Sequence, residues 1–146
     1  MPIPLEWDLS GKSAIVTADR RGWTPYLASA LAEAGAKVTL AGSPEHSDMG
    51  AAATAVEEQG GTALTLSVDL TDRAQVEAAV QRTVSEMGGA DILVNNARVE
   101  FGKPFVDVTE SEWQSVMDFN VKSVFLWSQA AGGHMLDRGG GRIVNI

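Results

Sequence analysis

The chain has 146 residues, of which 45% are hydrophobic and 21% charged, with a formal net charge of −8 and no cysteine. This length and composition predict one globular domain spanning 1–146. The negative charge argues against nucleic acid as a partner, the lack of cysteine excludes disulfides, and no apolar run is long enough to span a bilayer, so we expect a cytoplasmic protein without membrane contact.

Strand-like and helix-like patterns alternate along the first half of the chain, which predicts βαβ units. Short apolar runs predict strands at 13–17, 37–41 and 63–68. Helices are expected over 25–34 and 51–59. Thr24 and Pro25 suit the start of the first helix, with Thr24 as N-cap and Pro25 at the first helical position.

The second half continues the same alternation. Apolar residues recur at helical spacing before Gly88 at Val76, Val80, Val84 and Met87. A strand is expected at 92–95, and the capping-box pair Thr109 and Glu112 predicts a long helix from about Glu110. Three glycines then lead into a fifth strand at 142–146. The order predicts an α/β fold, a Rossmann-like doubly wound parallel sheet that stops after its fifth strand.

Loops at the ends of the predicted strands carry residues suited to a dinucleotide. The first loop precedes a helix, whose free N–H groups and dipole attract a diphosphate. Because parallel strands end at one edge of a sheet, the other loops should meet it there. The candidate residues of these loops are Thr17, Ala18, Asp19, Arg20, Arg21, Gly22, Trp23, Ser43, Asn95 and Asn96. Asn120 is the one polar member of the apolar stripe on the long helix.

The chain resembles the short-chain dehydrogenase/reductase family in three segments: the first loop, Asn95-Asn96-Ala97 and Phe119-Asn120-Val121. The resemblance covers nearly the whole chain and is greatest to the 3-oxoacyl-carrier-protein reductase branch. The resemblance implies the cofactor-binding portion of an oxidoreductase that interconverts alcohol and carbonyl. It further implies that Asp69, with Leu70 beside it, binds the adenine and that Asn95, Asn96 and Ala97 line the cofactor site. The backbone carbonyl of Asn120 would hold a proton-relaying water. In the family the helix that here follows Thr109 takes part in dimer packing, so we expect a homo-oligomer.

This chain departs from the family pattern at three glycines. The family loop reads Thr-Gly-x-x-x-Gly-x-Gly, and only Gly22 is retained, with Ala18 and Thr24 at the other two positions. Arg98 replaces the glycine of the Asn-Asn-Ala-Gly segment. Trp23 either forms a wall of the pocket or packs on the sheet, and core packing is the favoured role.

Two features favour NADP over NAD, which stays possible. The second strand ends without a carboxylate until Glu45, and an acid at that end would repel a 2′-phosphate. Arg21 lies where NADP-preferring relatives often have a basic residue, and it could pair with the phosphate. The alternative is that Arg20 and Arg21 are solvated loop charges. Asp69 could likewise cap the helix that follows it.

The family's catalytic serine and Tyr-x-x-x-Lys segment have no counterpart here. The one tyrosine, Tyr26, is followed four residues later by Ala30. We therefore expect an N-terminal portion that is itself catalytically silent, with the carbonyl or alcohol substrate bound by the full-length form. Two alternatives remain: a non-catalytic Rossmann module that binds a nucleotide or a partner, and an inert chain in which Thr24 and Arg98 block the cofactor.

Overall fold

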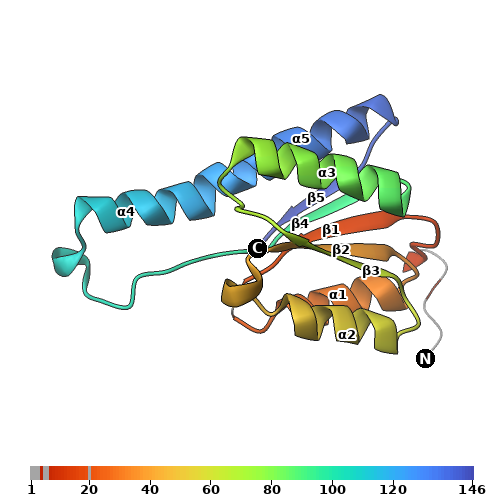
Figure 1. The fold of residues 1–146 in the computed structure, drawn as a ribbon, viewed down its shortest axis with the longest axis horizontal. Helices are drawn as coiled ribbons and strands as arrows, with labels where there is room; N and C mark the ends of the chain where they lie inside the picture. The colour runs from red at the N-terminus through yellow and green to blue at the C-terminus, as the bar shows by residue number, and fades with distance from the viewer. Residues whose placement is uncertain (1–3, 5–6, 20) are drawn as a thin grey trace.

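A computed structural model describes residues 4, 7–19 and 21–146 as a parallel sheet between two helical layers (Figure 1). The strands are β1 (Ser13–Thr17), β2 (Lys37–Gly42), β3 (Ala63–Ser67), β4 (Ile92–Asn95) and β5 (Arg142–Asn145). The helices are α1 (Thr24–Glu33), α2 (Met49–Glu58), α3 (Arg73–Met87), α4 (Glu110–Met117) and α5 (Ser123–Asp137). Every predicted strand and helix is confirmed, and where both bounds were predicted they differ by no more than two residues. The one long helix expected from about Glu110 is divided into α4 and α5.

The strand order is β3-β2-β1-β4-β5, and all neighbours are parallel. The chain runs outward from β1 to β3 and then crosses β1 to build β4 and β5. This reversal confirms the doubly wound fold. In open α/β sheets, ligands bind beyond the carboxyl ends of the strands at such a reversal, which lies here between β1 and β4.

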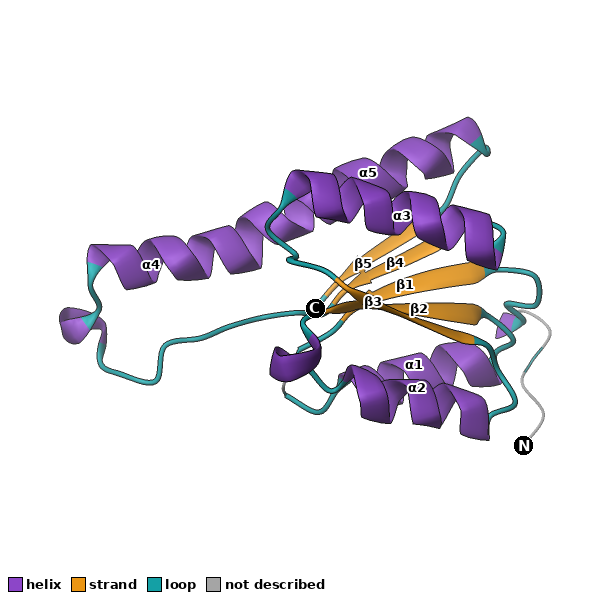
Figure 2. Ribbon diagram, viewed as in Figure 1, coloured by secondary structure: helices purple, strands orange, loops and turns teal. Residues whose placement is uncertain are grey.

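Strands β1, β2 and β4 are largely buried, with successive residues pointing to opposite faces of the sheet, whereas the edge strand β5 is exposed along its length. Helices α1 and α2 cover one face and α3 and α5 the other (Figure 2). In β1, Val16 joins the apolar cluster under α1 and α2, while Ile15 joins the cluster under α3 and α5. Both residues are fully buried. The central strand therefore holds the two layers together.

The predicted start of α1 is wrong in one detail. Thr24 is the first helical residue rather than the N-cap, and the N-cap, Trp23, makes no side-chain cap hydrogen bond. The buried Thr24 hydroxyl instead accepts a 3.2 Å hydrogen bond from Asn96 Nδ2. A hydroxyl that serves a distant loop in this way is not available to cap its own helix.

The capping box at the start of α4 is confirmed. The Glu112 N–H donates to Thr109 Oγ1 at 3.3 Å, and the Thr109 N–H donates to Glu112 Oε2 at 2.8 Å. Lys103 Nζ lies 2.6 Å from the same carboxylate oxygen. The Lys103 bond, together with the Thr109 bonds, lowers the pKa of Glu112 to about 2.

A π-helical turn, Asp118–Lys122, joins α4 to α5, and the sequence did not predict it. It is identified by the Ser123 N–H, which donates to Asp118 O, five residues back. Before the turn, α4 extends away from the sheet (Figure 1). Trp113 on α4 is 47% exposed, whereas Trp127 on α5 is fully buried. None of the described helices is both long and apolar enough to cross a membrane.

Candidate functional site

A pocket of about 350 Å³ opens at the carboxyl ends of β1, β2 and β3. Its lining includes four of the residues predicted from sequence: Ala18, Ser43, Asp69 and Leu70. His46 and Phe119 also line it, and the sequence did not predict either of them as a pocket residue. We call this the carboxyl-edge pocket.

Beside this pocket, Thr17 is bonded to the loop that follows β4. Its hydroxyl oxygen accepts hydrogen bonds from the backbone N–H groups of Asn96 and Ala97, at 2.9 and 3.0 Å. In return, Asn96 Nδ2 donates to Thr17 O at 3.3 Å and to Thr24 Oγ1 at 3.2 Å. The end of β1, the start of α1 and the end of β4 are thereby fixed relative to one another.

Asn96 itself is fully buried, and its Oδ1 has no hydrogen-bond partner in the part of the chain that the structure describes. A buried acceptor without a partner is uncommon in native structures. Asn95 is better satisfied, because its Nδ2 donates to Asn145 Oδ1 at 2.8 Å and to Ser128 Oγ at 3.2 Å. Asn95 thus ties β4 to β5 and α5, and the sequence did not predict these partners.

The guanidinium of Arg21 is bound within the first loop rather than solvated. Its Nε lies 2.5 Å from Oδ2 of Asp19, a residue that is 4% exposed, and its Nη2 donates to Asn96 O at 2.9 Å. We call Asp19, Arg21 and Asn96 the Arg21 clasp. For Arg21, the alternative of a solvated loop charge is therefore wrong. Arg20 lies outside the described residues.

Gly22 has a φ of +78°, a conformation that suits glycine, and no heavy atom lies within 4 Å of the place where a Cβ would be. Trp23 is 59% exposed and does not line the carboxyl-edge pocket. The favoured core-packing role of Trp23 is therefore wrong: the residue lies at the exposed start of α1, where the sheet does not cover it.

The residues that replace the family glycines are accommodated. No described non-glycine residue has a positive φ, so neither Ala18 nor Arg98 is strained. Thr24 fits into the hydrogen bonds around Asn96. Arg98 pairs with Glu100 at 3.2 Å and is exposed, which matches the surface-facing role expected for it.

Asp69 organises its own loop, while Asp72 caps α3. Asp69 Oδ1 accepts from Thr71 N at 2.9 Å and from Thr71 Oγ1 at 2.7 Å. The N-cap of α3 is Asp72, whose side chain accepts from Gln75 N. The alternative in which Asp69 caps α3 is wrong, because the helix begins four residues after Asp69, at Arg73.

Asn120 lies in the π turn and pairs with the backbone of Val99. Its Oδ1 accepts from Val99 N at 2.9 Å, and its Nδ2 donates to Val99 O at 2.7 Å. Both ends of the amide are thus used to hold the loop after β4 against the long helix. No local sequence signal predicts a contact between residues 21 positions apart.

Comparisons with known proteins agree with this geometry. A family model described as short chain dehydrogenase matches residues 12–146. Gluconate 5-dehydrogenase from Gluconobacter oxydans (strain 621H) is 38% identical over 146 residues, which is 100% of this chain and 57% of that protein. 2-Dehydro-3-deoxy-D-gluconate 5-dehydrogenase from Escherichia coli (strain K12) is 37% identical over 141 residues, or 96% of this chain and 54% of that protein.

A crystal structure of a short-chain type dehydrogenase/reductase from Mycobacterium marinum is also similar. It has a TM-score of 0.84 and 38% sequence identity, and the match covers 95% of this chain and 56% of that chain. The chain thus spans about half the length of the relatives that it matches.

Proposed function

Because the chain belongs to the short-chain dehydrogenase family, we propose that it forms the NAD(P)-binding portion of an oxidoreductase that interconverts an alcohol and a carbonyl by hydride transfer. The observation that carries this proposal is the carboxyl-edge pocket, where Ala18, Ser43 and Asp69 meet. Its volume of about 350 Å³ lies within the usual range for small-molecule sites and suits the adenosine half of a dinucleotide.

The residues present fit such a ligand. The α1 N-terminus and the open backbone at Gly22 suit the diphosphate, and Asp69 offers an acceptor to the adenine amino group. Asn95, Asn96 and Ala97 would border the nicotinamide side. Thr17 holds Asn96 and Ala97, Arg21 also holds Asn96, and Asn95 is held by Asn145 and Ser128. The bound coenzyme would supply the hydride. The backbone carbonyl of Asn120 would hold a water molecule. The turn that contains Asn120 is fixed by the hydrogen bonds of its side chain to Val99.

We propose NADP(H) rather than NAD(H) as the coenzyme. The residues near the end of β2 that line the pocket are Ser43 and His46, and neither carries a carboxylate that would repel a 2′-phosphate. The position of Arg21 in the sequence indicates a contact with the 2′-phosphate, but its contacts in the structure support the NADP preference less directly. Arg21 would have to leave Asp19 and Asn96 to reach a phosphate.

Titration of NADPH and NADH, followed by fluorescence or calorimetry, tests the proposal. We expect tighter binding of NADPH, and we expect Arg21→Ala to weaken both coenzymes by the same factor, about tenfold, because the clasp supports the common diphosphate loop. Arg98→Ala is the matched control, since it removes an exposed arginine paired with Glu100.

The outcomes of this titration separate the parts of the proposal. If neither coenzyme binds, the proposed function fails and the chain is inert toward dinucleotides. Equal affinities would refute the NADP preference alone. A loss confined to NADPH in Arg21→Ala would show that Arg21 contacts the 2′-phosphate and that the clasp opens on binding.

For the full-length form we propose a small polyhydroxy acid or its keto form as substrate. Two relatives are named as dehydrogenases of gluconate and of a deoxy-keto-gluconate. The alternative is a non-catalytic nucleotide-binding module. NADPH consumption with 5-keto-D-gluconate distinguishes the two, because a non-catalytic module consumes none.

We also propose that two copies associate through the helix after Thr109, in the cytoplasm. Exposed apolar side chains on this helix support the contact: Trp113 is 47%, Val121 52% and Phe125 53% exposed. Sedimentation equilibrium should give a dimer mass that Val121→Lys reduces to that of one chain. A single-chain mass for the unmodified protein would contradict the contact.

A further inference from the structure

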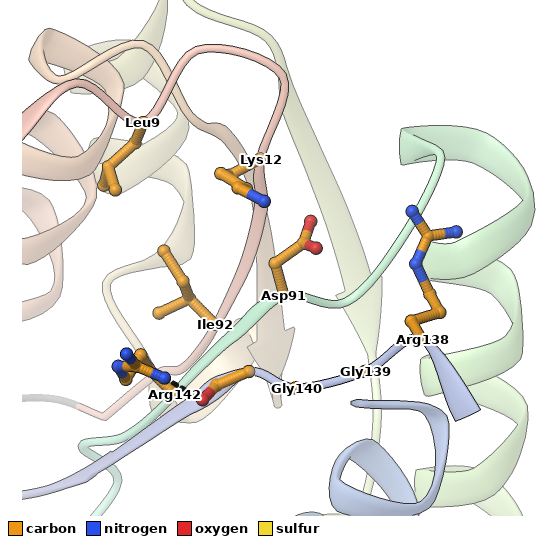
Figure 3. A pocket seen from close by; sticks show the side chains of 9 residues that line it. Leu9, Lys12, Asp91, Ile92, Arg138, Gly139, Gly140 and Arg142 are labelled. Atoms are coloured by element: carbon orange, nitrogen blue, oxygen red, sulfur yellow. Dashed lines mark hydrogen bonds between the residues drawn. The ribbon is translucent and has the colours of Figure 1, made fainter. Parts of the chain in front are cut away.

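A second pocket, of about 600 Å³, lies at the opposite edge of the sheet (Figure 3). Lys12 directly precedes β1, Asp91 directly precedes β4, and Arg142 is the first residue of β5. Because these strands are parallel, their first residues gather at one edge. We call this the amino-edge pocket. The length of the strands separates it from the carboxyl-edge pocket.

Positive side chains predominate around the amino-edge pocket. Lys12, Arg138 and Arg142 line it against the single carboxylate of Asp91, in a chain whose net charge is −8. The carboxylate is already engaged, because Asp91 Oδ2 accepts from Ser13 N at 2.9 Å. A concentration of cations on an otherwise acidic protein attracts an anion to that place.

Two of the three cations have no competing partner. The side chains of Lys12 and Arg138 make no hydrogen bond or ion pair with any residue that the structure describes. Arg142 Nη1 donates to Gly141 O at 2.9 Å, which leaves the rest of its guanidinium to other acceptors. In Figure 3 Lys12 and Asp91 lie between Arg138 on one side and Arg142, with Leu9 and Ile92, on the other.

The wall between Arg138 and Arg142 is bare backbone. It consists of Gly139, Gly140 and Gly141, and the first two have φ values of +87° and +142°. Side chains rarely adopt these angles, and a Cβ on Gly141 would collide with Met135. No side chain of this turn therefore covers the cations on either side of it.

From this arrangement we propose that the amino-edge pocket binds a small organic molecule through its phosphoryl group. A phosphoryl dianion has several strong acceptor oxygens, which suit the two unpaired cations, the guanidinium fork of Arg138 and the ammonium of Lys12. Leu9 and Ile92 offer apolar contact to the rest of the molecule. The site is separate from the coenzyme site and does not depend on the proposed oxidoreductase function.

Amide NMR spectra of the 15N-labelled chain test this site, with phenyl phosphate and inorganic phosphate as probes. We expect phenyl phosphate to shift the amide signals of Gly139, Gly140 and Gly141, with a dissociation constant on the order of 1 mM. Inorganic phosphate should shift the same signals at higher concentration, because it lacks the apolar contact. Equal affinity of the two probes would overturn the assignment of an organic ligand.

Two charge variants supply the control. Lys12→Ala and Arg138→Ala should each weaken binding about tenfold, whereas Lys122→Ala, which removes the same charge from the π turn, should leave it unchanged. Shifts confined to Gly22 would place the anion at the coenzyme loop and overturn the proposal. So would the absence of any shift, or an equal loss in all three variants, which would indicate unspecific attraction.

Discussion

Replacing Thr17 with valine is expected to lower the free energy of unfolding by about 2–5 kcal/mol. The substitution keeps the shape of the side chain but removes the oxygen that accepts from the N–H groups of Asn96 and Ala97. Both donors are buried, so each is left without a partner in a place that water does not reach. Urea denaturation of the two proteins measures the loss. Coenzyme affinity should fall as well, because the same bonds position the loop after β4.

Thr39→Val is the matched control for this prediction. Thr39 lies in the neighbouring strand β2 and is fully buried, but its Oγ1 has no partner among the described residues. Removing that oxygen abolishes an unsatisfied polar atom, so stability should stay the same or rise by about 1 kcal/mol. If the two valine variants were equally destabilised, the loss at Thr17 would come from packing and not from its hydrogen bonds.

Replacing Trp127 with alanine should cost about 3–5 kcal/mol. Trp127 is fully buried in the cluster that joins α5 to β1 and β4, where Ile15 and Leu93 also lie. Truncation removes the ring and leaves a cavity that the surrounding strands cannot fill. Since a domain of this size is usually stable by only about 5–15 kcal/mol, thermal melting should show a large drop.

Trp127→Phe separates the volume of the ring from its polar atom. Trp127 Nε1 is buried without a hydrogen-bond partner among the described residues, so phenylalanine removes an unsatisfied donor while keeping most of the apolar surface. We expect a loss of no more than about 1.5 kcal/mol. A loss as large as that of alanine would mean that the full indole volume, and not apolar contact in general, holds α5 on the sheet.

The sequence predicted the fold well because its signals are local. Apolar runs mark the buried strands, and the Thr109 and Glu112 pair marks the start of α4 within one turn of helix. The N-cap assigned to Thr24 failed for the opposite reason: its hydroxyl accepts from Asn96, 72 residues away. The π turn at 118–122 was also missed, since none of its residues differs from those of an ordinary helix.

The candidate site was predictable to a similar extent. Ala18, Ser43 and Asp69 could be placed together because parallel strands end at one edge, whatever their contacts. The partners of Arg21 and Asn120 could not be predicted in this way. Each depends on how the loop after β4 folds back. The acceptors are the backbone carbonyls of Asn96 and Val99, and no sequence pattern identifies a backbone carbonyl as an acceptor.

The central position of β1 has a consequence for the electrostatics of the whole chain. Lys12 and Ala18 flank its two ends, one in each pocket, and six steps of about 3.3 Å along the extended chain separate them by about 20 Å. At physiological ionic strength this is more than twice the screening length of about 8 Å. Two anionic ligands could therefore occupy the opposite edges of the sheet at the same time without measurable mutual repulsion.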